Sequence, residues 1–217
     1  MTNQNIFLTR HFIHVILIHM KLWKPTNTIE TILCLFAVII IPITSIILGF
    51  QESILYENLT YIGNQPQHRL LFQIWGILVS TDYLLSFYYL TRKTKICSIR
   101  LILFAFLLTT SSISSFFIPY NPSIYPFLSN LHVYTSLLSS VFTIFFIIYY
   151  ISLFQLIHPI YFHKCFQFII FFITISVTLL FVLGDISGLL ELIMSIFLSI
   201  FLYYMIRAYD IHKTSTQ

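Results

Sequence analysis

Charged side chains are scarce in this chain. Only 8% of its 217 residues are Asp, Glu, Lys or Arg, whereas 58% are apolar. A soluble globule of this size needs more polar surface to face water, so the composition excludes a soluble domain. Instead, the sequence contains several runs of about 20 apolar residues, each long enough to cross a hydrocarbon core of roughly 30 Å.

Cysteines are few, and the common catalytic signatures are missing. The three cysteines lie far apart and form neither a CxxC pair nor a metal-binding spacing, which predicts apolar packing as their role. The patterns HExxH, GxSxG, GxGxxG and the P-loop are absent, so no metal and no cofactor are expected. No internal repeat indicates the paired halves of a transporter.

The apolar runs predict an all-α fold, a polytopic integral membrane six-helix bundle. Pro42 is expected to kink the first span, and Ser129 to cap the start of the fourth. The expected spans cover residues 30–50, 70–91, 101–118, 131–156, 165–183 and 188–207. The domain prediction is a segment on the cytoplasmic face (1–28), a six-span domain (29–208) and a cytoplasmic tail (209–217).

Residues 6–23 are apolar but carry several basic side chains. At 100° per residue, Arg10, His14 and Lys21 fall on one face of a helix, with Ile and Phe opposite. As a seventh span, this segment would bury two cations at high cost. The pattern therefore predicts an amphipathic helix lying in the membrane interface.

The distribution of basic residues predicts the orientation. With six spans, ten of the eleven Lys and Arg residues fall on one side and only Arg69 on the other. The positive-inside rule then places both termini in the cytoplasm, in a multi-pass protein of the cell membrane. The net charge of +4 is attributed to this topology and to anionic headgroups. The predicted partners are membrane lipids, with another membrane protein as a further option, and not nucleic acid.

Asp82 is the most informative residue inside a span. It lies near the expected bilayer midplane, where a carboxylate is costly. It should therefore face the bundle and be either paired or protonated. An intramembrane carboxyl of this kind indicates a functional site.

A second set of polar residues lies near the expected outer end. His132 and Glu191 each sit about one turn inside their spans, and we expect a hydrogen bond between them beneath the proline-rich loop 119–127. Candidates for catalysis are Asp82, His132 and Glu191, and candidates for ligand binding are His132, Ser136, Asp185, Glu191, Ser111 and Ser115. The serines suit helix–helix packing equally well.

Short motifs add a family resemblance. They are Tyr61-Ile62-Gly63, Phe72, Ser115-Phe116-Phe117-Ile118-Pro119, Leu131-His132 and Gly188-Leu189-Leu190-Glu191. Through these motifs, residues 30–207 resemble the DRAM/Sfk-like six-span membrane proteins and their small bacterial relatives. The DRAM/Sfk-like group includes a factor acting after GPI attachment. The resemblance implies a six-helix bundle with cytoplasmic termini, in which His132 and Glu191 are the matching polar positions. It implies no reaction.

Three functions are compatible with these features. The first is an accessory, lipid-handling or lipid-sensing protein with an outward-facing polar pocket. The second is an intramembrane metal-dependent hydrolase or lipid-remodelling enzyme, in which Asp82, His132 and Glu191 hold a metal or act as acid and base. The third is a small proton- or cation-coupled transporter with Asp82 as its ion site. The absent repeat and the single buried carboxylate argue against the third.

Overall fold

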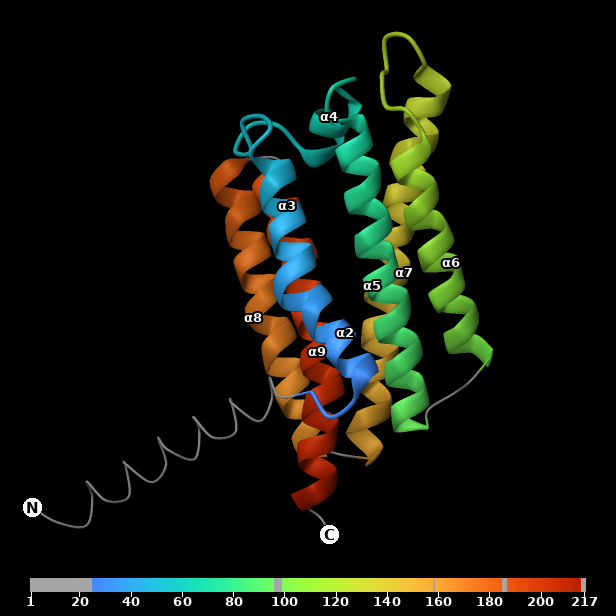
Figure 1. Ribbon diagram of the computed structural model, residues 1–217, viewed down its shortest axis with the longest axis vertical. Helices are drawn as coiled ribbons and strands as arrows, with labels where there is room; N and C mark the ends of the chain where they lie inside the picture. The colour runs from blue at the N-terminus through green and yellow to red at the C-terminus, as the bar shows by residue number, and fades with distance from the viewer. Residues whose placement is uncertain (1–24, 96–98, 158, 185–186, 216–217) are drawn as a thin grey trace, which may run out of the picture.

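The computed structural model describes residues 25–95, 99–157, 159–184 and 187–215, and over these it is all-helical (Figure 1). Six helical segments are long and apolar enough to cross a membrane, which confirms the predicted fold class. The interfacial helix predicted for residues 6–23 lies outside the described residues.

The first span consists of three consecutive pieces: α2 (Thr28–Leu35), the π-helical η1 (Phe36–Ile40) and α3 (Ile41–Gly49). Pro42 explains the π-helical turn, because it has no N–H to donate to a carbonyl four residues back. Just before it, the Ile41 N–H donates to the carbonyl of Phe36, five residues back. The expected distortion thus precedes the proline.

The later elements are α4 (Leu59–Asn64), α5 (Arg69–Thr94), α6 (Ile99–Phe117), α7 (Pro126–Ile157), α8 (Pro159–Leu183) and α9 (Gly188–Ser215). The short helix α4 was not expected; the Asn58 side chain starts it by accepting from the Tyr61 N–H at 2.7 Å. The assignment of Ser129 as an N-cap was wrong, because α7 already begins at Pro126. The Ser129 hydroxyl instead accepts from the N–H of Asn121 at 2.8 Å.

Helices α5 and α9 form the centre of the bundle. Helix α5 packs against α3, α4, α6 and α9, while α9 packs against η1, α3, α5 and α8. In the most apolar 18-residue stretch of α5 and of α9, half of the residues are buried inside the protein, whereas in that of α8 none is. Buried polar groups on α5 and α9 are therefore shielded from lipid by the helices around them.

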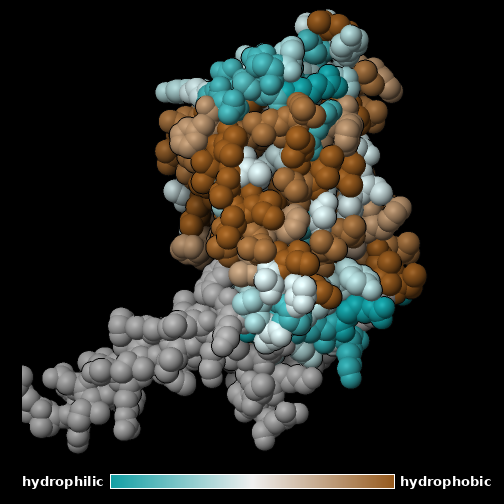
Figure 2. All heavy atoms as spheres, in the orientation of Figure 1, coloured by the Kyte–Doolittle hydropathy of each residue, from teal (hydrophilic) through white to brown (hydrophobic). Residues whose placement is uncertain are grey.

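On the face shown in Figure 2, a broad hydrophobic band lies between polar residues at the two ends of the bundle. We call the end formed by residues 50–68 and 118–125 the loop end, and the opposite end the basic end. Among the described residues, the basic end holds Arg92, Lys93, Lys95, Arg100, Lys164 and Arg207, and Arg69 is the one Lys or Arg at the loop end. This asymmetry agrees with the positive-inside argument, and the cytoplasmic placement of both termini stays a prediction.

Candidate functional site

A polar stripe runs along the central helix α9. Four residues advance an α-helix by about 400°, so each step of four turns the stripe by about 40°, and between its two ends the stripe winds about 160° around the helix. From Glu191 to Arg207 the stripe spans about 24 Å, most of the thickness of a hydrocarbon core. Its members, which we call the axial seam, are Glu191, Ser195, Ser199, Tyr203 and Arg207.

Asp82 meets the axial seam at its middle. Its side chain is 1% exposed, which confirms that it faces the bundle and not lipid. The Ser199 hydroxyl donates to Asp82 Oδ2, and the Ser86 hydroxyl also lies against the carboxyl group. The other oxygen, Oδ1, has no hydrogen-bond partner among the described residues.

This environment suits a neutral carboxyl better than an ionised one. No Lys, Arg or His in the described part of the chain forms an ion pair with Asp82. Burying an unpaired carboxylate costs several kcal/mol, whereas one unsatisfied oxygen of a neutral acid costs about 1–3 kcal/mol. Among the described residues, Asp82 is therefore supplied with hydroxyl donors and with no counter-charge.

Toward the loop end, a hydrogen-bond network joins three spans. The Trp75 indole N–H on α5 donates to Ser45 Oγ on α3 at 2.8 Å, and Ser45 Oγ lies 3.4 Å from Ser195 Oγ on α9. The hydroxyl of Tyr83 donates to the carbonyl of Ser195 at 3.3 Å. These bonds fix α3 and α5 against the axial seam between Asp82 and the loop end.

The loop end of the axial seam is covered by residues 54–59. Glu191 Oε2 accepts from the N–H of Leu59 at 2.6 Å. The N–H of Gly188 donates to the carbonyl of Glu57 at 2.8 Å, and that of Leu189 to the carbonyl of Ile54 at 2.9 Å. Gly188 is required for this approach, because a Cβ there would lie 2.7 Å from the Glu57 oxygen. We call these three bonds the loop-end latch.

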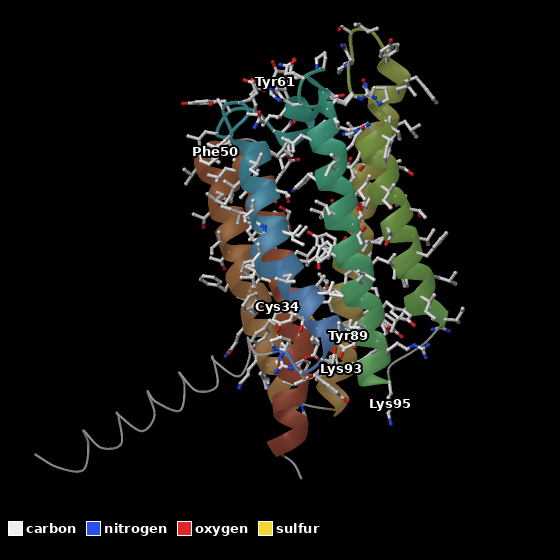
Figure 3. The ribbon with its side chains drawn as sticks, viewed as in Figure 1. Cys34, Phe50, Tyr61, Tyr89, Lys93 and Lys95 are labelled. Atoms are coloured by element: carbon white, nitrogen blue, oxygen red, sulfur yellow. The ribbon has the colours of Figure 1, made fainter. Side chains whose placement is uncertain are left out.

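The basic end of the axial seam is closed by a buried ion cluster around Glu30. This carboxylate is fully buried, and it accepts from Arg207 Nη1 at 2.8 Å, from Lys93 Nζ and from the Tyr89 hydroxyl at 3.0 Å. These bonds join α2, α5 and α9. Figure 3 shows Tyr89 and Lys93 near each other at this end, and Lys93 Nζ lies 5.3 Å from the centre of the Tyr89 ring. We call the bonds of Glu30 to Arg207, Lys93 and Tyr89 the basic-end latch.

Sequence reasoning placed Glu30 only at the start of a span and missed this cluster. A local signal was nevertheless present, because Asn27-Thr28-Ile29-Glu30 is a capping-box pattern before an apolar run. Asn27 Oδ1 accepts from the Glu30 N–H at 3.0 Å, and Glu30 Oε2 accepts from the Thr26 N–H at 2.9 Å. Capping therefore holds the carboxylate at the helix start, where α5 and α9 bring their cations.

His132 and Glu191 bind neighbouring residues and not each other. His132 is 3% exposed; its Nδ1 donates to the carbonyl of Ile118 at 3.1 Å, and its Nε2 lies 3.4 Å from Thr60 Oγ1. Glu191 instead binds Leu59, the residue before Thr60. The described residues contain no His132–Glu191 hydrogen bond, so α4 separates the two side chains that we expected to pair.

The predicted serines form bonds within their own helices. Ser111 donates to the carbonyl of Leu107 at 2.7 Å, and Ser115 to that of Ser112 at 2.7 Å. The carbonyl of Ser136 accepts from the Ser140 hydroxyl at 3.1 Å. Asp185 lies outside the described residues. A ligand-binding role for these residues stays a prediction, and so does a role in helix–helix packing.

The three catalytic candidates do not converge in this structure. The partner of Asp82, Ser199, lies about 12 Å along α9 from Glu191, because eight residues separate them. His132 binds α4 and the end of α6. In the described part of the chain, no group of three or more His, Cys, Asp and Glu side chains could hold a metal ion.

The fold and site define a class: an all-helical protein with six membrane-spanning candidates and a buried polar seam. Comparison of the chain with protein-family models, with curated proteins and with solved structures finds no match. The resemblance to the DRAM/Sfk-like proteins stays an expectation drawn from short motifs.

Proposed function

We propose that this protein is a secondary transporter whose coupling ion binds at Asp82. The observation that carries the proposal is a carboxyl group that is 1% exposed at the middle of a polar seam, with one oxygen unpartnered. Ionisable groups buried in membrane helices mark ion pathways and proton relays. Lipid handling needs no such group at this depth.

The structure removes one argument against transport. The sequence suggested a single buried carboxylate, but Glu30 is fully buried and Glu191 is bound to a backbone N–H at the loop end. Carboxyl groups thus lie at three levels of the axial seam, with Glu30 and Glu191 each about 12 Å from the level of Asp82. A series of acidic groups across the membrane supports an ion pathway better than one isolated group.

The two latches support a closed state of an alternating-access cycle. The loop-end latch consists of a few polar bonds between α9 and residues 54–59, and the basic-end latch of a few polar bonds between α2, α5 and α9. Water can replace such bonds without unfolding a span, so one latch can open while the other holds. In this proposal, opening of either latch exposes Asp82 to the solution on that side.

Ion flux into proteoliposomes tests the proposal. Purified protein is reconstituted, and Na⁺, K⁺ or proton gradients are imposed in turn while internal pH and ion content are followed. We expect flux above that of protein-free vesicles under at least one gradient, and its loss in Asp82→Asn. Glu52→Gln is the matched control, because Glu52 is 40% exposed at the loop end. Equal flux in Asp82→Asn and wild type would reject the proposal.

Lipid handling at the loop end is the second candidate, because the tip of the α6–α7 hairpin is apolar and exposed. Ile124, Tyr125 and Phe127 are 63%, 50% and 76% exposed. Figure 1 shows this hairpin extending beyond the ends of α3 and α5. Aromatic side chains at such a position suit the headgroup region. We expect Phe127→Ser to weaken lipid-dependent thermal stabilisation in nanodiscs if this candidate is correct, and Asp82→Asn to leave it unchanged.

A further inference from the structure

We propose that the ion bound at Asp82 is a proton, carried as the neutral carboxylic acid. This inference rests on the proposed transport function and names its coupling ion. Three features support it: the hydrogen-bond partners of Asp82, the lack of metal ligands around it, and the uncharged surroundings of the site.

Two acidic side chains in the described part of the chain, Glu30 and Asp82, are almost completely buried, and their surroundings differ. Glu30 receives two cationic side chains, two hydroxyl groups and a backbone N–H, the set of donors that stabilises an ionised carboxylate. Asp82 receives only hydroxyl groups, from Ser199 and Ser86, and its Oδ1 receives nothing among the described residues. Glu30 is thus equipped to remain charged, whereas Asp82 is equipped to be neutral.

A metal cation lacks ligands at the same place. Na⁺ and Ca²⁺ are held by a shell of several oxygens, which membrane transporters supply largely from the carbonyls of unwound helices. Helices α5 and α9 run without a break past Asp82 and Ser199, so their carbonyls are used within the helices. The side-chain oxygens that the described residues bring together here are those of Asp82, Ser199 and Ser86, fewer than a hydration shell supplies.

The groups that face Asp82 leave its charge uncompensated. On its own helix the neighbouring titratable side chain is Tyr83, and on α9 it is Tyr203, one turn beyond Ser199. The segments η1 and α3 contain no titratable residue, and α6 contributes the Ser112 hydroxyl, which is bonded to Ser80. The nearest cation on α9 is Arg207, which lies about 12 Å along the helix from Ser199 and is bound to Glu30.

The binding step needs no other reactant. A hydronium ion on one side gives its proton to a carboxylate oxygen of Asp82: one O–H bond of the hydronium breaks and leaves water, one O–H bond forms on the carboxyl, and one negative charge is cancelled. In the reverse step the proton passes to water on the opposite side, and the carboxylate that remains accepts from Ser199. Loss of that charge during each crossing is what allows the group to stay buried between the two latches.

Infrared spectroscopy of the protein reconstituted in lipid at neutral pH tests this inference. A protonated carboxyl gives a carbonyl stretching band that an ionised carboxylate lacks, and the band shifts in D₂O. We expect this band in wild-type protein, its loss in Asp82→Asn and its retention in Glu191→Gln. Asp82→Glu is the second variant in case Asp82→Asn folds poorly, and it should shift the band without removing it.

The result separates the inference from the proposed function. A spectrum in which Asp82→Asn changes no carboxyl band would overturn the proton assignment. If Asp82-dependent flux in proteoliposomes then followed a Na⁺ gradient at constant pH, transport would stand and the ion would be Na⁺. If the band were present but no gradient gave flux, Asp82 would be a protonated structural group and both proposals would fall.

Discussion

Arg207 Nη1 donates to Glu30 Oε2 over 2.8 Å and joins the last span to the first across 177 positions of the chain. Both side chains are almost completely buried, at 5% and 0% exposed. The pair closes the basic end of a seam whose middle is Asp82 and whose other end is Glu191. Two kinds of buried acid, one paired with cations and one not, therefore contact the same helix, α9, at Arg207 and at Ser199.

Glu30→Gln should strongly destabilise the protein. The substitution removes the carboxylate that Lys93 and the buried Arg207 bind, and breaking a buried ion pair in this way costs about 3–5 kcal/mol. Unfolding in mixed micelles measures the loss, with Glu52→Gln as the control. Equal stability of the two variants would mean that the cluster contributes little.

The double variant Glu30→Gln/Arg207→Gln should recover part of that loss, because removing both charges leaves fewer unpaired groups. We expect a coupling of about 0.5–3 kcal/mol in a double-mutant cycle with the two single variants. Additive losses would contradict a direct interaction between the two side chains.

Ser45→Ala should cost about 1–3 kcal/mol of unfolding free energy, because it leaves the buried N–H of Trp75 without its acceptor. Ser114→Ala is the matched control, since that exposed hydroxyl donates only to a carbonyl of its own helix, that of Thr110. Its effect should stay within about 0.5 kcal/mol. If Ser45→Ala behaved like Ser114→Ala, the network between α3, α5 and α9 would not stabilise the bundle.

Gly188→Ala should be destabilising although alanine is the better helix former. In an ordinary helix the change gains up to about 1 kcal/mol. Here the added methyl would lie 2.7 Å from the Glu57 oxygen, a backbone atom that can move only with its segment. Thermal unfolding in detergent shows directly whether Gly188→Ala raises or lowers the stability. A stabilised variant would show that the loop-end latch is looser than described.

The orientation is tested by cysteine labelling in intact cells. In a background without the three native cysteines, Tyr56→Cys at the loop end should react with an impermeant maleimide, and Lys95→Cys should react only after lysis. Both positions are exposed, so neither result reflects burial. Labelling of Lys95→Cys from outside would reverse the predicted topology.

Hydropathy and the cost of intramembrane charge predicted most of the fold and the burial of Asp82. Both are local quantities that depend on span length and depth. The burial of Glu30 in an ion cluster was not predicted, because a carboxylate at the end of a span can reach water. Only tertiary packing brings Lys93 and Arg207 to it. The pairing of His132 with Glu191 failed because α4, formed within a polar loop, supplies partners to both. The four-residue spacing on α9 was visible in the sequence and identifies the axial seam.

The central claim is that Asp82 binds the transported ion. Its most direct test is to measure the charge displaced across the membrane when the ion concentration is changed rapidly. Proteoliposomes adsorbed to a solid-supported membrane report this charge before any complete transport cycle and without a known substrate. We predict a transient current on a pH jump in wild type and in Glu52→Gln, and none above protein-free membranes in Asp82→Asn. An undiminished transient in well-folded Asp82→Asn would contradict the claim.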